Sequence, residues 1–145
     1  MVVIQDITAR KNAEAALWES EMLLRVAFTQ AAVGIAVLDH NLNPLRVNEK
    51  FCEISGQTRD SLLKMRVGDL THADDREMER GLFDALTAQK ITHCAYEKRY
   101  VLPDESVTHA AIEISASLGP DGKAERFIAI VQDITESKQI QTALR

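Results

Sequence analysis

The sequence has few residues that break or cross-link a chain, and few aromatic ones. In 145 residues there are three prolines, six glycines and two cysteines, and aromatic residues make up 5%. Cys52 and Cys94 can form at most one disulfide and have no metal-knuckle spacing, so neither a disulfide-built scaffold nor a zinc site is indicated. We expect both cysteines to be reduced and the protein to be cytoplasmic.

The chain also lacks a surplus of positive charge and a long apolar run. Its formal charge is -5, its pI is near 5.4, and no Lys/Arg run is present. This argues against nucleic acid or an anionic membrane as a partner. The uncharged stretch between Arg25 and Asp39 is shorter than the roughly 20 residues that cross a bilayer, and no signal peptide is visible. We therefore expect no nucleic-acid binding and no membrane contact by this fragment.

A repeated tetrapeptide is the clearest feature that the chain does have. Gln-Asp-Ile-Thr occurs at residues 5–8 and again at residues 132–135. The separation nearly equals the chain length, which suits one small domain plus a linker helix better than solenoid repeats of roughly 20 to 50 residues. We predict two equivalent exits: residues 1–8 end a preceding unit, with a strand over 1–5, and residues 135–145 begin a C-terminal signalling helix.

Residues 9–31 predict a linker helix, because the segment is rich in Ala, Leu, Glu and Arg and contains neither glycine nor proline. Leu17, Leu24 and the neighbouring Trp18 offer more apolar surface than one helix buries alone. We predict that this helix joins two copies of the chain into a homodimer. The alternative, that the helix packs wholly on its own core, stays open.

Residues 32–134 predict one α+β domain. Strands are expected over 34–38, 44–47, 91–102, 106–118 and 126–132, with short helices after Asn48 and a longer helix over about 74–89. This order indicates a five-stranded antiparallel sheet with its helices on one face. Ile128 and Ile130 make the second face of the last strand apolar, so we expect the N-terminal helix to cover it.

Several short motifs follow one another in a familiar order: Ser20-Glu21, Gly34-Ile35, Asn48, Cys52, Gly56, Asp69-Leu70, His72-Ala73-Asp74-Asp75, Gly119-Pro120-Asp121-Gly122 and Asp133-Ile134-Thr135. From residue 34 to residue 144 the chain resembles a PAS domain with its C-terminal PAC segment, of the kind found in bacterial sensor histidine kinases and diguanylate cyclases. The resemblance implies a non-catalytic sensory module with an output domain downstream. Ala73, Glu105 and Gln57 depart from the family, which often has proline, glycine and an aromatic residue there.

Members of the family carry haem, flavin or small organic ligands. Haem-binding members present an axial histidine from the long helix, and residues 74–89 contain none; the Asn-Cys-Arg-Phe type motif of the light sensors is absent too. No cofactor is therefore evident, and of the family's ligand classes only a small organic ligand stays open. Its candidate pocket comprises Phe51, Met78, Leu82, Tyr96, Tyr100, Ile112 and Ile114. Alternatively the aromatic residues fill the core, with Lys98 reaching solvent and Glu79 on the solvated face of the helix.

The leading hypothesis is that a change in the core shifts the last strand, and that Gln132, Asp133 and Thr135 pass this shift into the C-terminal helix. A haem or flavin sensor of redox state or light is one alternative. A small cone-shaped α+β cavity enzyme using a His/Asp pair is another, although no catalytic or metal-binding constellation is recognisable.

Overall fold

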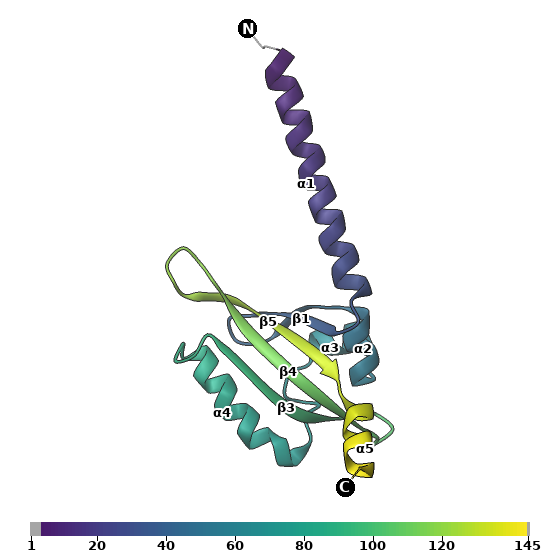
Figure 1. Cartoon of the computed structure of the whole chain (residues 1–145). Helices are drawn as coiled ribbons and strands as arrows, with labels where there is room; N and C mark the ends of the chain where they lie inside the picture. The colour runs from purple at the N-terminus through teal and green to yellow at the C-terminus, as the bar shows by residue number, and fades with distance from the viewer. Residues whose placement is uncertain (1–3, 145) are drawn as a thin grey trace.

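The computed structural model describes residues 4–144, and their arrangement is shown in Figure 1. In chain order the elements are α1 (Ile4–Gln30), β1 (Gly34–Asp39), β2 (Pro44–Val47), α2 (Glu49–Ser55), α3 (Arg59–Lys64), the 3-10 helix η1 (Ala73–Asp75), α4 (Arg76–Thr87), β3 (His93–Val101), β4 (Val107–Leu118), β5 (Ala124–Asp133) and α5 (Thr135–Ala143).

Within the described residues the strands form a single antiparallel sheet in the order β2-β1-β5-β4-β3. The last strand of the chain, β5, therefore lies in the centre, between β1 and β4. Ala129 is level with Ala36 on β1 and with Ile114 on β4, so two small side chains and a branched one lie side by side across the buried face. The predicted five-stranded α+β fold is confirmed.

The core lies between one face of this sheet and the short helices. Phe127, Ala129 and Val131 of β5 are buried, and they pack in one cluster with Phe51 of α2 and Leu86 of α4. Their period of two residues along β5 follows from the pleat, which sends alternate side chains to opposite faces. At about 25 cal/mol per Å² of apolar surface removed from water, such side chains supply most of the driving force for folding.

The buried side chain of Asn48 joins three elements. Its Oδ1 accepts hydrogen bonds from the N–H groups of Phe51 (3.0 Å) and Ile35 (2.8 Å), which caps α2 and holds it against β1. Its Nδ2 donates to the carbonyl oxygens of Phe28 (2.8 Å) and Val33 (3.0 Å), at the end of α1 and in the following turn. Asn48 is fully buried, and these four bonds leave its amide satisfied.

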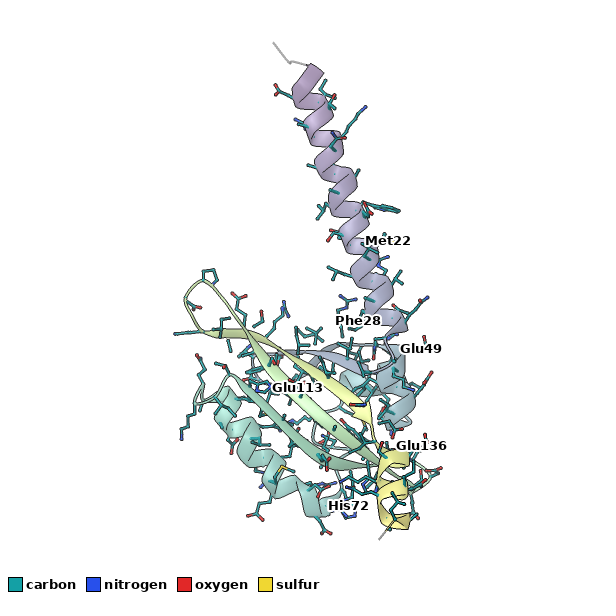
Figure 2. The ribbon with its side chains drawn as sticks, in the orientation of Figure 1. Met22, Phe28, Glu49, His72, Glu113 and Glu136 are labelled. Carbon is teal, nitrogen blue, oxygen red and sulfur yellow. The ribbon has the colours of Figure 1, made fainter. Side chains whose placement is uncertain are left out.

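Helix α1 contacts the domain only at its C-terminal end and then projects away from it (Figure 1). Phe28 sits where the helix meets the sheet, with the guanidinium of Arg46 4.6 Å above its ring, whereas Met22 lies beyond the domain (Figure 2). The expectation that this helix covers the second face of the sheet is wrong, and so is the alternative of a helix packed on its own core. Ile128 and Ile130 consequently remain 42% and 40% exposed.

The first copy of the tetrapeptide lies inside α1, and the second lies where β5 meets α5. The strand expected over residues 1–5 is helical at Ile4 and Gln5, and residues 1–3 lie outside the described part of the chain. The two copies are thus not equivalent here, because a strand needs a neighbour to pair with and the N-terminal copy has none. That residues 1–8 end a preceding unit stays a prediction.

The family departure at Glu105 coincides with a left-handed backbone. Glu105 has φ 70° in the turn between β3 and β4, a conformation that glycine adopts at no steric cost. Gly56, one of the family's motif residues, has φ 70° at the C-cap of α2. A glycine at position 105, as is common in the family, would therefore suit this turn better than glutamate.

We predict that Asn48→Asp lowers the free energy of unfolding by about 2 to 4 kcal/mol, because it removes both N–H donors and buries a carboxylate beside two carbonyl oxygens. Urea unfolding measures the change. The control, Asn12→Asp on the exposed surface of α1, should change stability by less than about 0.5 kcal/mol. Equal effects of the two substitutions would show that the Asn48 bonds do not hold the fold.

Candidate functional site

The predicted ligand pocket is mostly filled by its own side chains. Phe51, Tyr100, Ile112 and Ile114 are buried and line an enclosed cavity of about 20 Å³, which has room for about one water molecule. Leu82 and Tyr96 are partly buried and pack against the same core. The assignment of Met78 to this pocket is wrong: Met78 is 42% exposed, because in the first turn of α4 it is the next residue, Glu79, that faces the sheet.

Glu79 takes part in a buried polar network. Its carboxylate accepts hydrogen bonds from Thr71 Oγ1 (2.6 Å, to Oε1) and from Tyr96 OH (2.6 Å, to Oε2), and Oε2 lies 2.5 Å from Lys98 Nζ. Lys98 Nζ also donates to Thr71 Oγ1 (3.0 Å) and stands 4.6 Å from the centre of the Tyr100 ring. The expectations of a solvated Glu79 and of a Lys98 that reaches solvent are therefore wrong, since the two residues are 1% and 3% exposed.

Burial dominates the titration behaviour of the network. It lowers the pKa of Lys98, and the neighbouring Glu79 carboxylate opposes that shift. Burial likewise raises the pKa of Tyr96 and of Tyr100, and the negative charge of Glu79 adds to both shifts. The two tyrosines thus stay protonated, and Tyr96 acts as a hydrogen-bond donor to the carboxylate.

Two sequence signals could have identified this pair. Lys98 falls between Tyr96 and Tyr100 on the apolar face of its strand, where a solvated lysine is out of place. Glu79, Leu82 and Leu86 have the spacing of one helix face, so a glutamate shares the buried side of α4. Each signal is weak alone, because Glu79 and Lys98 lie on different elements. Only the folded arrangement of α4 and β3 shows that the two charges are partners.

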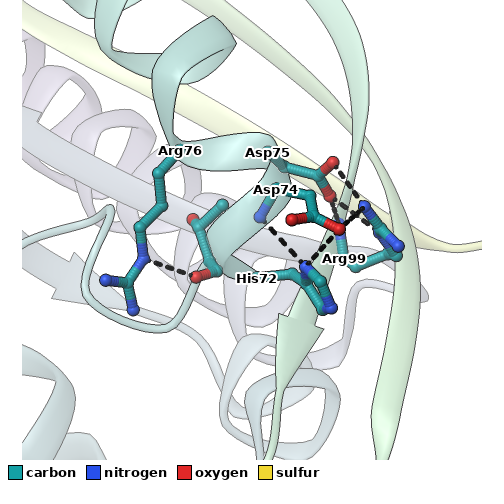
Figure 3. Close-up of polar contacts among 6 residues, drawn as sticks. His72, Asp74, Asp75, Arg76 and Arg99 are labelled. Carbon is teal, nitrogen blue, oxygen red and sulfur yellow. Dashed lines mark hydrogen bonds and ion pairs between the residues drawn. The ribbon is translucent and has the colours of Figure 1, made fainter.

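The start of α4 is fixed by a second polar cluster (Figure 3). Arg99 on β3 donates from Nε (3.0 Å) and Nη2 (2.9 Å) to the Asp75 carboxylate, which also accepts the Arg99 backbone N–H (2.9 Å). These hydrogen bonds lower the pKa of Asp75. The side chain of His72 accepts from the backbone N–H of Asp74 at 3.1 Å and caps η1.

A groove of about 600 Å³ opens on the outer side of Glu79. It runs between α4, the loop at residues 66–69 and the turn at residues 41–43. Arg66, Arg76 and Arg80 lie along it, and Phe83 contributes an apolar surface. This groove could not be recognised from the sequence, since its walls come from three separate segments of the chain.

The joint between β5 and α5 places all three predicted transmission residues beside β4. Thr135 Oγ1 accepts the backbone N–H of His109 (3.0 Å), and the backbone N–H of Ile134 donates to the His109 carbonyl (2.8 Å). Asp133 Oδ1 accepts the backbone N–H of Thr135 (2.9 Å). Gln132 is exposed and pairs through its backbone with Ala111. The transmission role of these residues stays a prediction.

The core does not fit haem or flavin in this conformation. A cavity of about 20 Å³ is far below the roughly 300 to 1,000 Å³ of typical ligand sites, and the Glu79–Lys98 pair occupies the space beside Tyr96.

Within residues 4–144 no three His, Cys, Asp or Glu side chains converge as metal ligands. Among the helices of the same range, none combines the length and the apolar character needed to span a membrane.

An antiparallel sheet with helices on one face and a helix leaving its central strand is the architecture of a small sensory domain. The family model described as "PAS domain" matches residues 32–136, and the chain belongs to the PAS domain family. This single match does not show the PAC segment, which the sequence suggested, as a separate unit. The matched region begins after α1 and ends just inside α5.

Two curated relatives are signalling proteins. The chain is 28% identical over 123 residues to "Probable diguanylate cyclase DgcE" from Escherichia coli (strain K12), covering 85% of this chain and 11% of that protein. It is 26% identical over 129 residues to "Sensor histidine kinase TmoS" from Ectopseudomonas mendocina, covering 89% of this chain and 13% of that protein. The chain therefore spans only a small part of either relative.

Among solved structures, the PAS domain of an HTR-like protein from Haloarcula marismortui superposes with a TM-score of 0.68 at 22% identity, covering 86% of this chain and 99% of that one. At this identity the similarity concerns the fold alone. Together with the family match, it identifies the chain as a PAS sensory domain of the kind found in signalling proteins.

We predict that Lys98→Met destabilises the protein by about 3 to 5 kcal/mol, because the Glu79 carboxylate is left buried without its cation. The double variant Glu79→Gln with Lys98→Met should recover most of that loss, since the glutamine oxygen accepts from one of the two hydroxyl groups, Thr71 or Tyr96, and its NH2 group donates to the oxygen of the other, without a charge. Urea unfolding of the four members of this cycle measures the coupling. Additive effects would mean that the two side chains do not depend on each other.

Proposed function

We propose that this PAS domain is a non-catalytic sensory and dimerisation module of a multidomain bacterial signal-transduction protein, and that it passes a change in its core through the Asp-Ile-Thr joint to the downstream helix. The observation that carries the proposal is the set of hydrogen bonds by which Thr135 and Ile134 hold His109 at the joint. A cyclase or kinase output domain farther along the chain is part of the proposal, because both curated relatives are much longer proteins with such activities in their names.

The joint suits mechanical transmission because it continues the sheet without a flexible linker. β5 is hydrogen-bonded on both sides, to β1 and β4, and α5 begins two residues after it ends. Lys138 on α5 also lies 2.9 Å from Glu97 on β3, so the helix is tied to a strand that borders the core. A shift of β3 or β4 relative to β5 thus changes the position of α5, and a few kcal/mol suffice to separate two such states.

Homodimerisation through α1 is the second part of the proposal. Leu17, Trp18 and Leu24 are 60%, 65% and 67% exposed on a helix that has no cover within the described chain. Contiguous exposed apolar surface of this kind marks an interaction site. A second copy is the proposed partner, because two such helices bury each other's apolar stripe.

The domain is proposed to act in the cytoplasm. Cys52 and Cys94 are both free thiols, as expected in a reducing compartment. Burial raises the pKa of each thiol, so neither is activated as a nucleophile.

We predict that Asp133→Ala with Thr135→Ala uncouples sensing from output in the full-length protein. The variant loses the bonds to His109 and Thr135 at about 1 kcal/mol each, which leaves the core folded. The measurement is the ratio of stimulated to unstimulated output activity, which should fall to about one. Asp60→Ala with Thr92→Ala, at exposed positions away from the joint, is the matched control. Normal regulation in the joint variant would contradict the transmission role.

For the dimer, we predict that Leu17→Glu with Leu24→Glu shifts the protein to monomer in native mass spectrometry, because two carboxylates replace the apolar stripe. Asn12→Glu with Ala15→Glu adds comparable charge on the opposite side of α1 and should leave the dimer intact. A monomeric wild-type protein, or equal loss of dimer in both variants, would refute an interface on this face.

A further inference from the structure

We propose that the groove beside α4 binds a small organic anion, a metabolite that carries a carboxylate or phosphate group together with hydroxyl groups. The inference rests on the proposed sensory function and names the class of ligand that would be sensed. The groove is large enough for such a ligand: its volume of about 600 Å³ lies within the typical range for small-molecule sites, whereas the enclosed cavity holds about 20 Å³.

The three arginines carry the argument for an anion. Arg76 and Arg80 are four residues apart on α4, so their like charges face the same side of the helix and repel each other. Arg66 approaches from the loop opposite. Within residues 4–144 no acidic side chain pairs with any of these guanidinium groups. A bound carboxylate or phosphate would relieve the repulsion and accept paired hydrogen bonds, which a guanidinium donates well.

Arg76 is already oriented for such contact. Its Nε donates to the carbonyl oxygen of Thr71 at 2.9 Å, which fixes the side chain and leaves its two Nη groups available. Figure 3 shows Arg76 directed away from the Asp75–Arg99 pair, on the other side of the helix start. The polar contacts of Arg99 are thus separate from the groove, and Arg76 is held in place before a ligand binds.

The remaining polar groups limit the size and charge of the ligand. Asp69 and Asp84 also line the groove, so a large polyanion is disfavoured, whereas ligand hydroxyl groups can donate to these carboxylates and to the oxygens of Asn41 and Asn43. Phe83 offers an apolar wall for a short carbon skeleton. In a small hydroxylated mono- or dianion, the anionic group can bind the arginines while the hydroxyl groups donate to the two carboxylates.

Glu79 places the groove next to the core. It lines the groove, and a Cβ added at Gly68 would lie 3.5 Å from Glu79 Oε1, so the carboxylate lies close to the backbone of loop 66–69. Behind it, Glu79 is bonded to Lys98 and Tyr96 of β3. A ligand that pulls Arg76 and Arg80 toward loop 66–69 would therefore move a helix that is hydrogen-bonded to the sheet.

The test is isothermal titration calorimetry of the whole chain with two probes, malate and glycerol 3-phosphate, at constant ionic strength. Glycerol and malamide, which lack the anionic group, are the neutral comparisons. Saturable binding of either probe, with none by the neutral comparisons, is expected, and the stronger probe shows whether carboxylate or phosphate is preferred. Arg66→Gln with Arg80→Gln should weaken that binding at least about tenfold. Arg59→Gln with Arg126→Gln, the same charge change away from the groove, should alter it less than about twofold.

Three results would overturn the proposal: no saturable binding of either probe, equal weakening by the control variant, or binding that survives the Arg66/Arg80 change. Calorimetry needs no output domain, so absence of binding counts against the groove alone, whereas failure of the joint variant to uncouple output counts against transmission.

Discussion

One buried amide determines how this domain is connected to the helix before it. Asn48 uses both its acceptor and its donor atoms, and its four partners belong to α1, the turn after it, β1 and α2. Such a buried group is stable only in the geometry that satisfies it, since each lost bond leaves a polar atom without water. The end of α1 is thus fixed relative to the sheet, while the rest of the helix projects away from the domain.

The Glu79–Lys98 pair plays the corresponding part between α4 and β3. Burying two charges costs free energy, and the cost is offset only while the carboxylate keeps its three donors. Intermediate positions of α4, in which the pair is separated but still buried, are therefore unfavourable. This favours discrete arrangements of α4 over a continuous range. From β3 the hydrogen-bonded ladder continues through β4 and β5 to the joint.

Local patterns predicted the parts of the fold that depend on neighbours in sequence. The strands β3 to β5 were predicted close to their observed bounds, and Asn48 was recognised before a helix because a cap acts over three or four residues. The features that failed are tertiary. Whether Lys98 reaches solvent depends on a helix twenty residues earlier, and the direction of α1 depends on Asn48 rather than on the helix's own apolar residues. The groove was missed for the same reason, because its walls meet only after folding.

The pairing of β1 with β5 gives the two terminal helices a common reference. β1 begins at Gly34, which is level with Val131 near the end of β5. The helix that enters the domain and the helix that leaves it are therefore attached at the same end of two adjacent strands. A small sliding of β5 against β1 therefore changes the position of α5 relative to α1 directly. The loop at residues 119–122 lies at the opposite end of β5, away from both helices. Ile128 and Ile130 expose apolar surface on the outer face of β5, so a partner that covers this face would contact the strand whose movement is proposed to reach α5.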